Sequence, residues 1–178
     1  METSVQTKEN RALASCFEWV LMLIGALVTV AVIFTLLFRV VGVSGDSMKN
    51  TLKDGDRLIL ITQLYKIERG DIIVVTRANE EPYIKRVIAV AGDTIDIDDE
   101  SGRVLLNGKA IEEEYVLGGS TTSQGFDGPY TVKDGEVFAM GDNRTWSLDC
   151  RQLGPFFTHE IAGEAVFRLF PFETFGKI

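Results

Sequence analysis

One uninterrupted apolar block dominates the hydrophobic pattern near the start of the chain. Residues 19–38 contain no charged side chain, and Glu18 and Arg39 bracket them. About twenty residues at ~1.5 Å rise per residue form a helix of ~30 Å, the hydrocarbon thickness of a bilayer. A cleavable leader has a shorter apolar region followed by small residues, and a buried core helix rarely stays uncharged for so long. The pattern therefore predicts an uncleaved transmembrane helix over residues 16–40.

Beyond residue 40 the pattern changes to short runs of β-branched and apolar residues bounded by Gly, Asp and Asn. Such runs are typical of β-strands, and Ser101-Gly102 and Asn107-Gly108 are typical of hairpin turns. The Gly/Ser/Thr-rich stretch 118–128 is expected to be a loop. We predict an all-β, antiparallel domain over residues 41–178, with strands at residues 57–62, 71–76, 83–90, 94–97, 104–106, 136–140 and 164–169.

Charges around the helix indicate its orientation. Lys8 and Arg11 precede it and favour a cytoplasmic N-terminal segment, residues 1–15, although Arg39, Lys49 and further basic residues beyond the helix reduce the asymmetry. We expect a single-pass protein of the cytoplasmic membrane, with its N-terminus inside and its β-rich domain outside.

Composition excludes several classes of protein. The net charge is -8, so the surface would repel nucleic acid. The chain has one histidine and no closely spaced pair of cysteines, so it lacks the ligands of a typical zinc site. We expect no metal and no cofactor. Cys16 and Cys150 lie too far apart in the predicted layout for a disulfide. The acidic residues at 96–100 and 112–114 lack calcium-loop spacing, and a solvated hairpin face is the simpler interpretation.

Three segments are rich in polar residues that could carry chemistry. In the first, Gly45 and Asp46 precede Ser47, so that the serine could occupy a tight turn with its backbone N–H directed at a developing oxyanion. Gly-Asp-Ser is also common in ordinary loops. This segment alone leaves both interpretations open.

The second segment surrounds Lys85. With a period of two, Tyr83, Lys85, Val87 and Ala89 share one face of a strand, which places the lysine among apolar neighbours. Burial would lower the pKa of its ammonium from ~10.4 toward neutrality, as a general base requires. In the alternative, Lys85 lies on an edge strand with its ammonium in water.

The third segment covers residues 141–151 (GDNRTWSLDCR). Its acidic and basic side chains can pair, and its Asn and Ser side chains can bridge backbone groups beneath an active site. A well-bonded structural loop would have the same composition.

Together, in this order and behind an N-terminal anchor, the three segments resemble the bacterial type I signal peptidases, in particular the short, single-anchor Gram-positive branch. The family's first sequence box, which holds its nucleophile, is similar to Ser47-Met48 with Thr51-Leu52. Its second box, which holds its lysine, is similar to residues 83–86 with Gly92-Asp93. The third is similar to residues 141–144 with Ser147, Asp149 and Arg151. The resemblance extends over most of the chain, including residues 165–178.

The resemblance implies a serine endopeptidase that cleaves signal peptides after small residues at the outer membrane face. Ser47 would be the nucleophile and Lys85 the general base, a known variant of activated-serine chemistry. Ser147 would hydrogen-bond the Lys85 amine, and Asp149 and Arg151 would pair beneath the site. The other supporting residues would be Gly45, Arg86, Asp142, Asn143 and Arg144, and the substrate pockets would be lined by Met48, Leu52, Tyr83 and Ile84.

The implied partners are signal peptides of exported preproteins and the lipid bilayer, with the secretion machinery as a further candidate. A short connection from Arg39 to Ser47 keeps the serine within ~26 Å of the membrane exit, at ~3.3 Å per residue. An apolar patch that contacts lipid could be added by Phe167, Leu169, Phe170, Phe172 and Phe175, although core packing is an equally good use of some of these phenylalanines.

Three positions depart from the family pattern. Gly45 stands where some members have a second oxyanion-hole serine, so backbone donors, chiefly the Ser47 N–H, would carry that stabilisation. Asn50 stands where proline is usual, which would loosen the turn after Ser47. Cys150 stands where serine is common.

Three rival interpretations remain. One is a self-cleaving repressor with the same dyad, a role in which a membrane anchor has no place. Another is an anchored β-rich binding module without catalysis. The third makes Cys150 a nucleophile with His159, although nothing in the sequence orients that pair.

Overall fold

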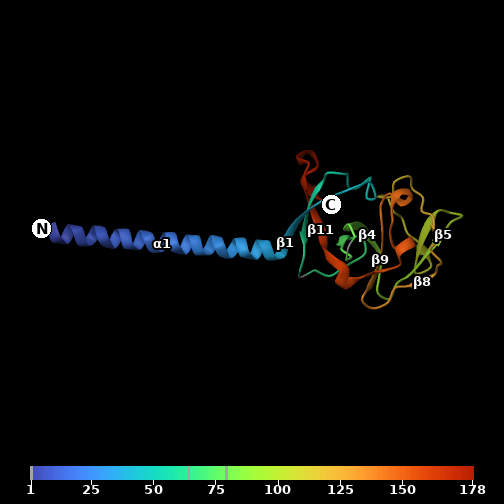
Figure 1. The fold of residues 1–178 in the computed structure, drawn as a ribbon, viewed down its shortest axis with the longest axis horizontal. Coiled ribbons are helices and arrows are strands. Elements are labelled where there is room, and N and C mark those ends of the chain that lie inside the picture. The colour runs from blue at the N-terminus through green and yellow to red at the C-terminus, as the bar shows by residue number, and fades with distance from the viewer. Residues whose placement is uncertain (1, 64, 79) are drawn as a thin grey trace. The chain divides into compact units, whose positions relative to one another are not determined.

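The computed structural model describes the backbone of residues 2–63, 65–78 and 80–178, with side chains from Phe17 onward. The chain separates into two units, Met1–Phe38 and Arg39–Ile178. Figure 1 shows that the first unit is helical and the second is built mainly of strands.

The first unit is the helix α1 (Glu2–Leu37). Its part from Phe17 to Leu37 has 21 residues and a mean hydropathy of 2.8, and none of it is buried within the protein. Length and composition are therefore sufficient to cross a bilayer. The helix begins well before the predicted residue 16 and ends at Leu37, because the chain enters strand β1 at Phe38.

The second unit contains one large sheet, in which the strands from Arg57 onward all pair antiparallel. Strand β11 (Ile161–Phe170), near the end of the chain, lies between β2 (Arg57–Ile61) and β3 (Ile72–Val75), so segments far apart in the sequence pair within the sheet. In spatial order its strands are β1 (Phe38–Gly42), β2 (Arg57–Ile61), β11 (Ile161–Phe170), β3 (Ile72–Val75), β4 (Tyr83–Val90), β9 (Glu136–Met140) and β10 (Phe156–Phe157), with β12 (Gly176–Lys177) paired to β11.

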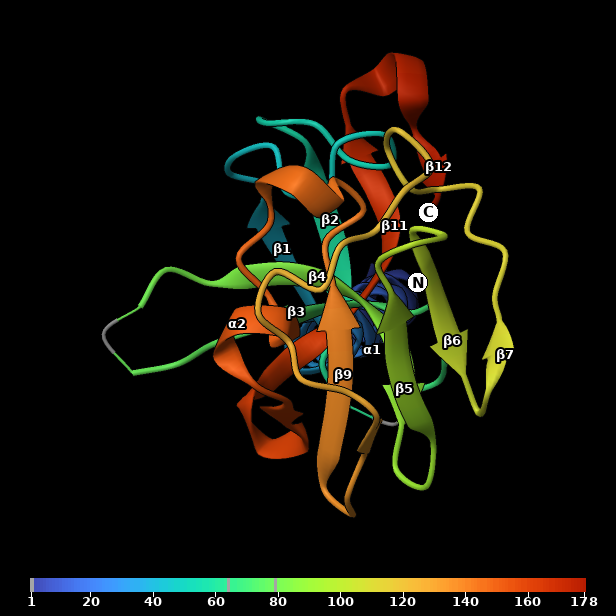
Figure 2. The ribbon, with the colours of Figure 1, turned by 90° about the vertical axis from the view of Figure 1, so that its right-hand side faces the viewer.

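A smaller sheet lies beside β9, as Figure 2 shows. Its order is β7 (Lys109–Ala110), β6 (Arg103–Leu106), β5 (Thr94–Asp98) and β8 (Tyr130–Thr131). Short helices complete the fold: α2 (Cys150–Leu153) and the 3-10 helices η1 (Arg144–Trp146), η2 (Thr158–Glu160) and η3 (Phe172–Thr174).

Strand β4 is central, with β3 on one side and β9 on the other. The expected alternation holds from Tyr83 to Val87, but a register shift between Val87 and Ala89 inserts Ile88 into the same buried cluster as its neighbours. Such a bulge bends a strand and re-aims its side chains. Both faces of β4 are covered, because Ile84 belongs to a second buried cluster, which also contains Met48 from the turn after β1 and residues of β2 and β3.

The larger buried cluster joins the two sheets. It contains Ile95 and Val104 from the small sheet together with Val87 and Phe138 from the large one. Apolar burial is the main favourable term in folding, so this shared core fixes the small sheet against β9.

The predicted all-β fold is confirmed. Each predicted strand is present, with ends shifted by at most a few residues, and residues 118–128 form a loop as expected. The strands that the pattern missed are β1 and four elements of two residues, β7, β8, β10 and β12, which are too short to display any period.

Phe138→Ala tests the shared core. Phe138 is 1% exposed, and its ring packs edge-on against Phe126 with centroids 5.1 Å apart. Truncation leaves a cavity, so we expect the free energy of unfolding to fall by about 3–5 kcal/mol in urea denaturation. Phe157→Ala, at a 44% exposed ring, is the matched control and should cost less than about 1 kcal/mol. Equal losses would contradict this assignment of the core.

Candidate active site

Ser47 and Lys85 are in direct contact. Lys85 Nζ lies 2.8 Å from Ser47 Oγ, a contact in which the ammonium donates and the neutral amine accepts, and it donates to the Ile84 carbonyl oxygen at 3.0 Å. The lysine is 3% exposed, whereas Ser47 is half-buried and remains accessible. A hydroxyl within hydrogen-bond reach of a basic nitrogen is the geometry of an activated nucleophile.

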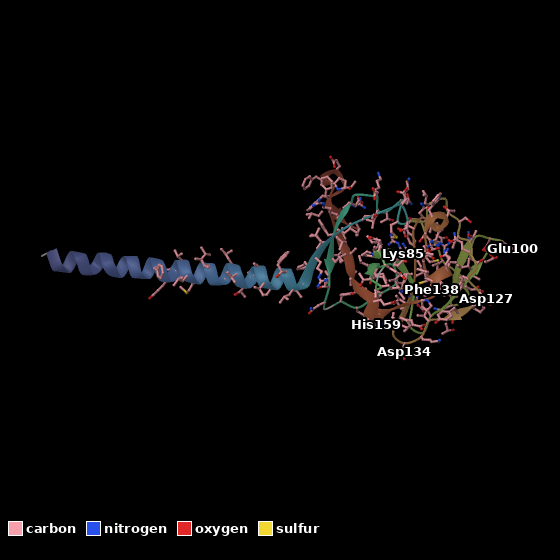
Figure 3. All side chains as sticks on the ribbon, viewed as in Figure 1. Lys85, Glu100, Asp127, Asp134, Phe138 and His159 are labelled. Carbon is pink, nitrogen blue, oxygen red and sulfur yellow. The ribbon has the colours of Figure 1, made fainter. Side chains whose placement is uncertain are left out.

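Burial lowers the pKa of Lys85 to about 8, and the charge of Asp149 only partly opposes this effect. The cause is the loss of hydration by the ammonium, since β4 is covered on both faces and paired on both edges. The interpretation of Lys85 as a solvated edge residue is therefore wrong. Figure 3 shows the lysine inside the β-rich unit.

The turn that carries Ser47 is held by its own polar groups. Gly45 has φ = 81°, a conformation that suits glycine, and its N–H donates to the Asp54 carboxylate at 2.9 Å. The Ser47 N–H forms no hydrogen bond to any residue that the structure describes. This donor is free to bind an external oxygen atom beside the hydroxyl.

The third segment contacts the Ser47 turn through its backbone. Asn143 N–H donates to the Ser47 carbonyl oxygen at 3.0 Å, and Asn143 Nδ2 donates to the Asp46 carbonyl oxygen at 3.1 Å. A Cβ atom on Gly141 would lie 2.4 Å from the Ser47 carbonyl oxygen and 2.3 Å from Ser147 Oγ. Only glycine allows this approach, so Gly141 lets the two segments meet.

Asp149 and Arg151 form a fully buried ion pair. Arg151 Nε and Nη2 each donate to the Asp149 carboxylate at 2.9 Å, and the Gly141 N–H donates to it at 3.0 Å. Burial raises the pKa of Asp149, but the hydrogen bonds and charge of Arg151 outweigh it, so the pKa lies below its ordinary value. The carboxylate also caps helix α2. The pairing expected beneath the site is present.

A second buried pair supports the other side. Arg86 Nε and Nη2 donate to the Asp142 carboxylate at 2.9 and 2.8 Å, and Thr51 Oγ1 donates to the same carboxylate at 2.5 Å. The Arg86 guanidinium lies over the Tyr115 ring at 4.1 Å. These contacts join β4, the Ser47 turn and the third segment through one carboxylate.

Arg144 pairs with a residue that sequence reasoning placed on a solvated face. Its Nη1 and Nη2 donate to the Glu113 carboxylate at 3.0 and 2.6 Å, and both side chains are buried. The solvated-face interpretation is thus wrong for Glu113. The sequence offers one indication of this pair. The third segment contains two arginines, and its two aspartates, Asp142 and Asp149, were not enough to show which distant acidic residue Arg144 would meet.

Sequence reasoning also missed Arg168 on β11. Its Nη2 donates to the Thr51 carbonyl oxygen, and its Nε lies 3.2 Å from the Asp56 carboxylate. Asp56 in turn accepts from the Lys53 N–H at 3.0 Å. Arg168 therefore anchors the end of the Ser47 turn to the large sheet.

Two expectations about site residues are not met. Ser147 lies beside the dyad, but its buried Oγ is not within hydrogen-bond distance of the Lys85 amine, so the expected bond is not formed. Its interaction with the Asp149 carboxylate, longer than an ordinary hydrogen bond, contributes to the lowered pKa of that group. Leu52 is fully buried in the core and does not line the hollow at the site. Leucine at this position packs beneath the turn instead of facing a substrate.

The hollow beside the dyad has a volume of about 190 Å³. It is lined by Met48, Tyr83 and Ile84, as expected, and by Val43, Ser44, Ser47, Pro82, Lys85 and Leu148. A larger hollow of about 580 Å³ shares Ser44, Pro82 and Ile84 with it. The two hollows follow the start of β4, where an extended chain could lie.

Asn50 adopts φ = 104°, which a proline ring forbids. Its Nδ2 donates to the Tyr115 carbonyl oxygen at 3.0 Å. The expectation of a looser turn is therefore not supported, because the asparagine side chain ties the turn to a segment 65 residues away.

Cys150 is not a nucleophile. It is 1% exposed, its Sγ accepts from the Ala139 N–H at 3.2 Å, and burial raises the pKa of its thiol to about 12. His159 is exposed, stacks on Phe157, and lies apart from Lys85 in Figure 3. The alternative in which these two residues act together is wrong.

Comparison with known proteins gives consistent matches. The family described as "Signal peptidase, peptidase S26" matches residues 16–170. The chain is 34% identical over 184 residues to signal peptidase I of Bacillus licheniformis, covering 97% of this chain and 98% of the relative. It is 33% identical to signal peptidase I S of Bacillus subtilis (92% and 94% covered) and 30% identical to signal peptidase IB of Staphylococcus aureus (89% and 91% covered).

Among solved structures, a signal peptidase I from Enterococcus faecalis is similar, with 26% sequence identity and a TM-score of 0.48. The match covers 57% of this chain and 98% of that one.

Lys85→Met tests the burial of the amine through the pH dependence of stability. Between pH 8 and 10.5 the unfolded chain holds the Lys85 proton more tightly than the folded chain, so the free energy of unfolding rises with pH. At ~1.4 kcal/mol per pH unit, the wild type should gain about 3 kcal/mol that the variant lacks. We expect the variant to be the more stable protein at pH 7 and to lose most of that advantage by pH 10.5.

Urea denaturation of both proteins across this pH range measures the difference between their free energies of unfolding. Groups that titrate alike in the two proteins cancel in that difference. A difference between the two proteins that stays constant with pH would mean that the Lys85 ammonium is solvated in the folded state.

Proposed function

The chain belongs to the signal peptidase family, peptidase S26, and from that premise we propose that Ser47 and Lys85 are its catalytic dyad. Membership makes the chain a serine endopeptidase that cleaves signal peptides. The observation that supports the dyad is the 2.8 Å contact between Lys85 Nζ and Ser47 Oγ in a site where the amine loses its hydration.

Acylation begins with the neutral amine. Its two N–H groups include the one that donates to the Ile84 carbonyl, which leaves the lone pair for the Ser47 hydroxyl. As Lys85 takes the proton, Ser47 Oγ attacks the carbonyl carbon of the scissile peptide bond. The Ser47 N–H, unpaired in the described structure, stabilises the oxyanion that develops.

The tetrahedral intermediate then collapses as the C–N bond breaks. The Lys85 ammonium gives its proton to the leaving nitrogen and returns to the neutral form, and the new N-terminus of the mature protein departs. A water molecule next gives a proton to Lys85 and attacks the Ser47 ester, and the same proton finally returns to Ser47 Oγ. The dyad ends the cycle in its starting protonation state.

Ser147 and the ion pairs act as positioning residues. The Ser147 Oγ lies against Gly141, beside the Ser47 carbonyl oxygen, so it can accept a hydrogen bond when Lys85 is protonated. Asp149 and Arg151 hold residues 141 and 151 in place, and the negative charge of Asp149 limits the cost of the ammonium.

The signal peptide lies extended along the start of β4. Its residue before the cleaved bond occupies the small hollow lined by Met48, Tyr83 and Ile84, whose 190 Å³ holds the main chain at the cleaved bond together with an alanine-sized side chain. Main-chain hydrogen bonds to the strand would give affinity, and alternate side chains would enter the two hollows.

The bilayer brings enzyme and substrate together. The eight residue steps from Arg39 to Ser47 span at most ~26 Å, at ~3.3 Å per step, so a membrane-inserted α1 keeps the dyad near the lipid surface. A signal peptide exposes its cleavage site just beyond its own apolar region, and tethering raises the effective concentration. The exposed rings of Phe170, Phe172 and Phe175 supply an apolar patch for lipid contact. We place the N-terminus inside and the catalytic unit outside.

Ser47→Ala and Lys85→Met should each reduce cleavage of an alanine-terminated preprotein at least about 10⁴-fold, because each removes an indispensable member of the dyad. Gel analysis of preprotein processing in detergent measures the effect. Ser101→Ala and Lys53→Met, at exposed positions, are matched controls that should stay active. Wild-type activity of either dyad variant would refute the dyad, and a folded wild type without any cleavage would favour the binding-module alternative.

A further inference from the structure

Two large apolar side chains are exposed immediately beside the dyad. Trp146 is 80% exposed and Leu148 is 50% exposed, whereas Ser147 between them is 5% exposed. Ser147 has extended backbone angles, φ = -124° and ψ = 122°. Successive side chains of an extended backbone alternate, so Leu148 projects away from the side of the buried hydroxyl, and it lines the hollow at the site. Trp146, the last residue of η1, is exposed on the other side of Ser147 in the sequence.

The backbone beneath this pair is held firmly. The Arg144 carbonyl oxygen accepts from Arg151 Nη2 at 2.8 Å and from Gln124 Nε2 at 2.9 Å, and the Trp146 N–H donates to the Asn143 carbonyl oxygen at 3.0 Å. An aromatic side chain on a fixed backbone loses little conformational freedom when it binds a ligand. Exposed apolar groups in such a setting are typical of a recognition surface.

The position of Leu148 relates the pair to the reaction. Leu148 lines the small hollow together with Ser47 and Lys85, and it comes from the third segment, whereas Tyr83 and Ile84, which also line the hollow, come from β4. The peptide before the cleaved bond occupies the β4 side, and the leaving nitrogen must lie near Lys85 Nζ to receive its proton. Beyond that nitrogen the peptide continues past Ser147, whose Oγ lies beside Gly141 and the Ser47 carbonyl.

We propose that Trp146 and Leu148 bind the first residues after the cleaved bond, the start of the mature protein, and favour apolar side chains there. This inference rests on the proposed function, because it takes the direction of the peptide from the dyad. A polypeptide fits better than lipid here: the pair is small, and the exposed Asp46–Lys49 ion pair, with a 3.6 Å separation, lies on the adjoining turn. A lipid-inserting surface would have to desolvate those charges.

The test uses two peptides with the same residues before the cleaved bond and with either Leu-Leu or Ser-Ser after it. We expect the wild type in detergent to prefer the Leu-Leu peptide about fivefold to tenfold in kcat/KM, the scale for partial burial of apolar groups. In the double variant Trp146→Ala/Leu148→Ala this ratio should fall to about one. Because both rates come from one preparation, the amount of folded enzyme cancels in the ratio.

Control variants make the test specific. Trp146→Phe keeps an apolar ring and should keep most of the preference, and Phe157→Ala, which removes an exposed ring on β10, should leave the ratio as in the wild type. A wild type without preference, or a double variant that keeps it, would overturn the inference. So would a loss seen only in phosphatidylcholine vesicles and equal for both peptides, since that result indicates lipid contact.

The two proposals fail separately. If Ser47→Ala cleaves both peptides like the wild type, the dyad itself is wrong. If Ser47→Ala is inactive and the double variant still prefers the Leu-Leu peptide, only the role of Trp146 and Leu148 is wrong.

Discussion

The desolvation of the Lys85 amine constrains the rest of the catalytic unit. An ammonium in this position would lose its hydration at a cost of roughly 3 kcal/mol, given a pKa lowered to about 8 at ~1.4 kcal/mol per unit. The apolar clusters on both faces of the sheet around β4 stabilise the fold and so offset that cost. The same burial that disfavours the charged form makes the amine a base near neutral pH, so the stability lost at this site is tied to its chemistry.

Three distant segments must hold the dyad together, and they do so mainly through backbone contacts and buried charge. Gly141 allows the third segment to approach the Ser47 carbonyl, and Asp142 joins Arg86 to Thr51. Breaking a buried pair leaves an uncompensated charge, which typically costs more than the pair contributes. In the proposed mechanism the ion pairs around the dyad therefore serve to position its members, whatever they add to the stability of the fold.

The sequence was informative where a local pattern was long enough. The helix, strand β4 and the order of the three polar segments could all be predicted, since each depends on neighbouring residues. The burial of Lys85 could not be derived with certainty, because it depends on β11 inserting between β2 and β3 and on β9 pairing with β4. The partner of Arg144 was missed for the same reason: Glu113 lies 31 residues away on a segment with no distinguishing period. Ser147 and Leu52 show that a motif position does not fix which atoms a side chain contacts.

The most direct test of a neutral, buried amine acting on Ser47 is the pH dependence of kcat/KM for a signal-peptide substrate in detergent. Lys85 must be unprotonated to accept the serine proton, so kcat/KM should rise about tenfold per pH unit below pH 8 and level off above it. A rate that keeps rising to pH 10.5, the value for a solvated lysine, or one that is flat from pH 6 to pH 9, would contradict the account.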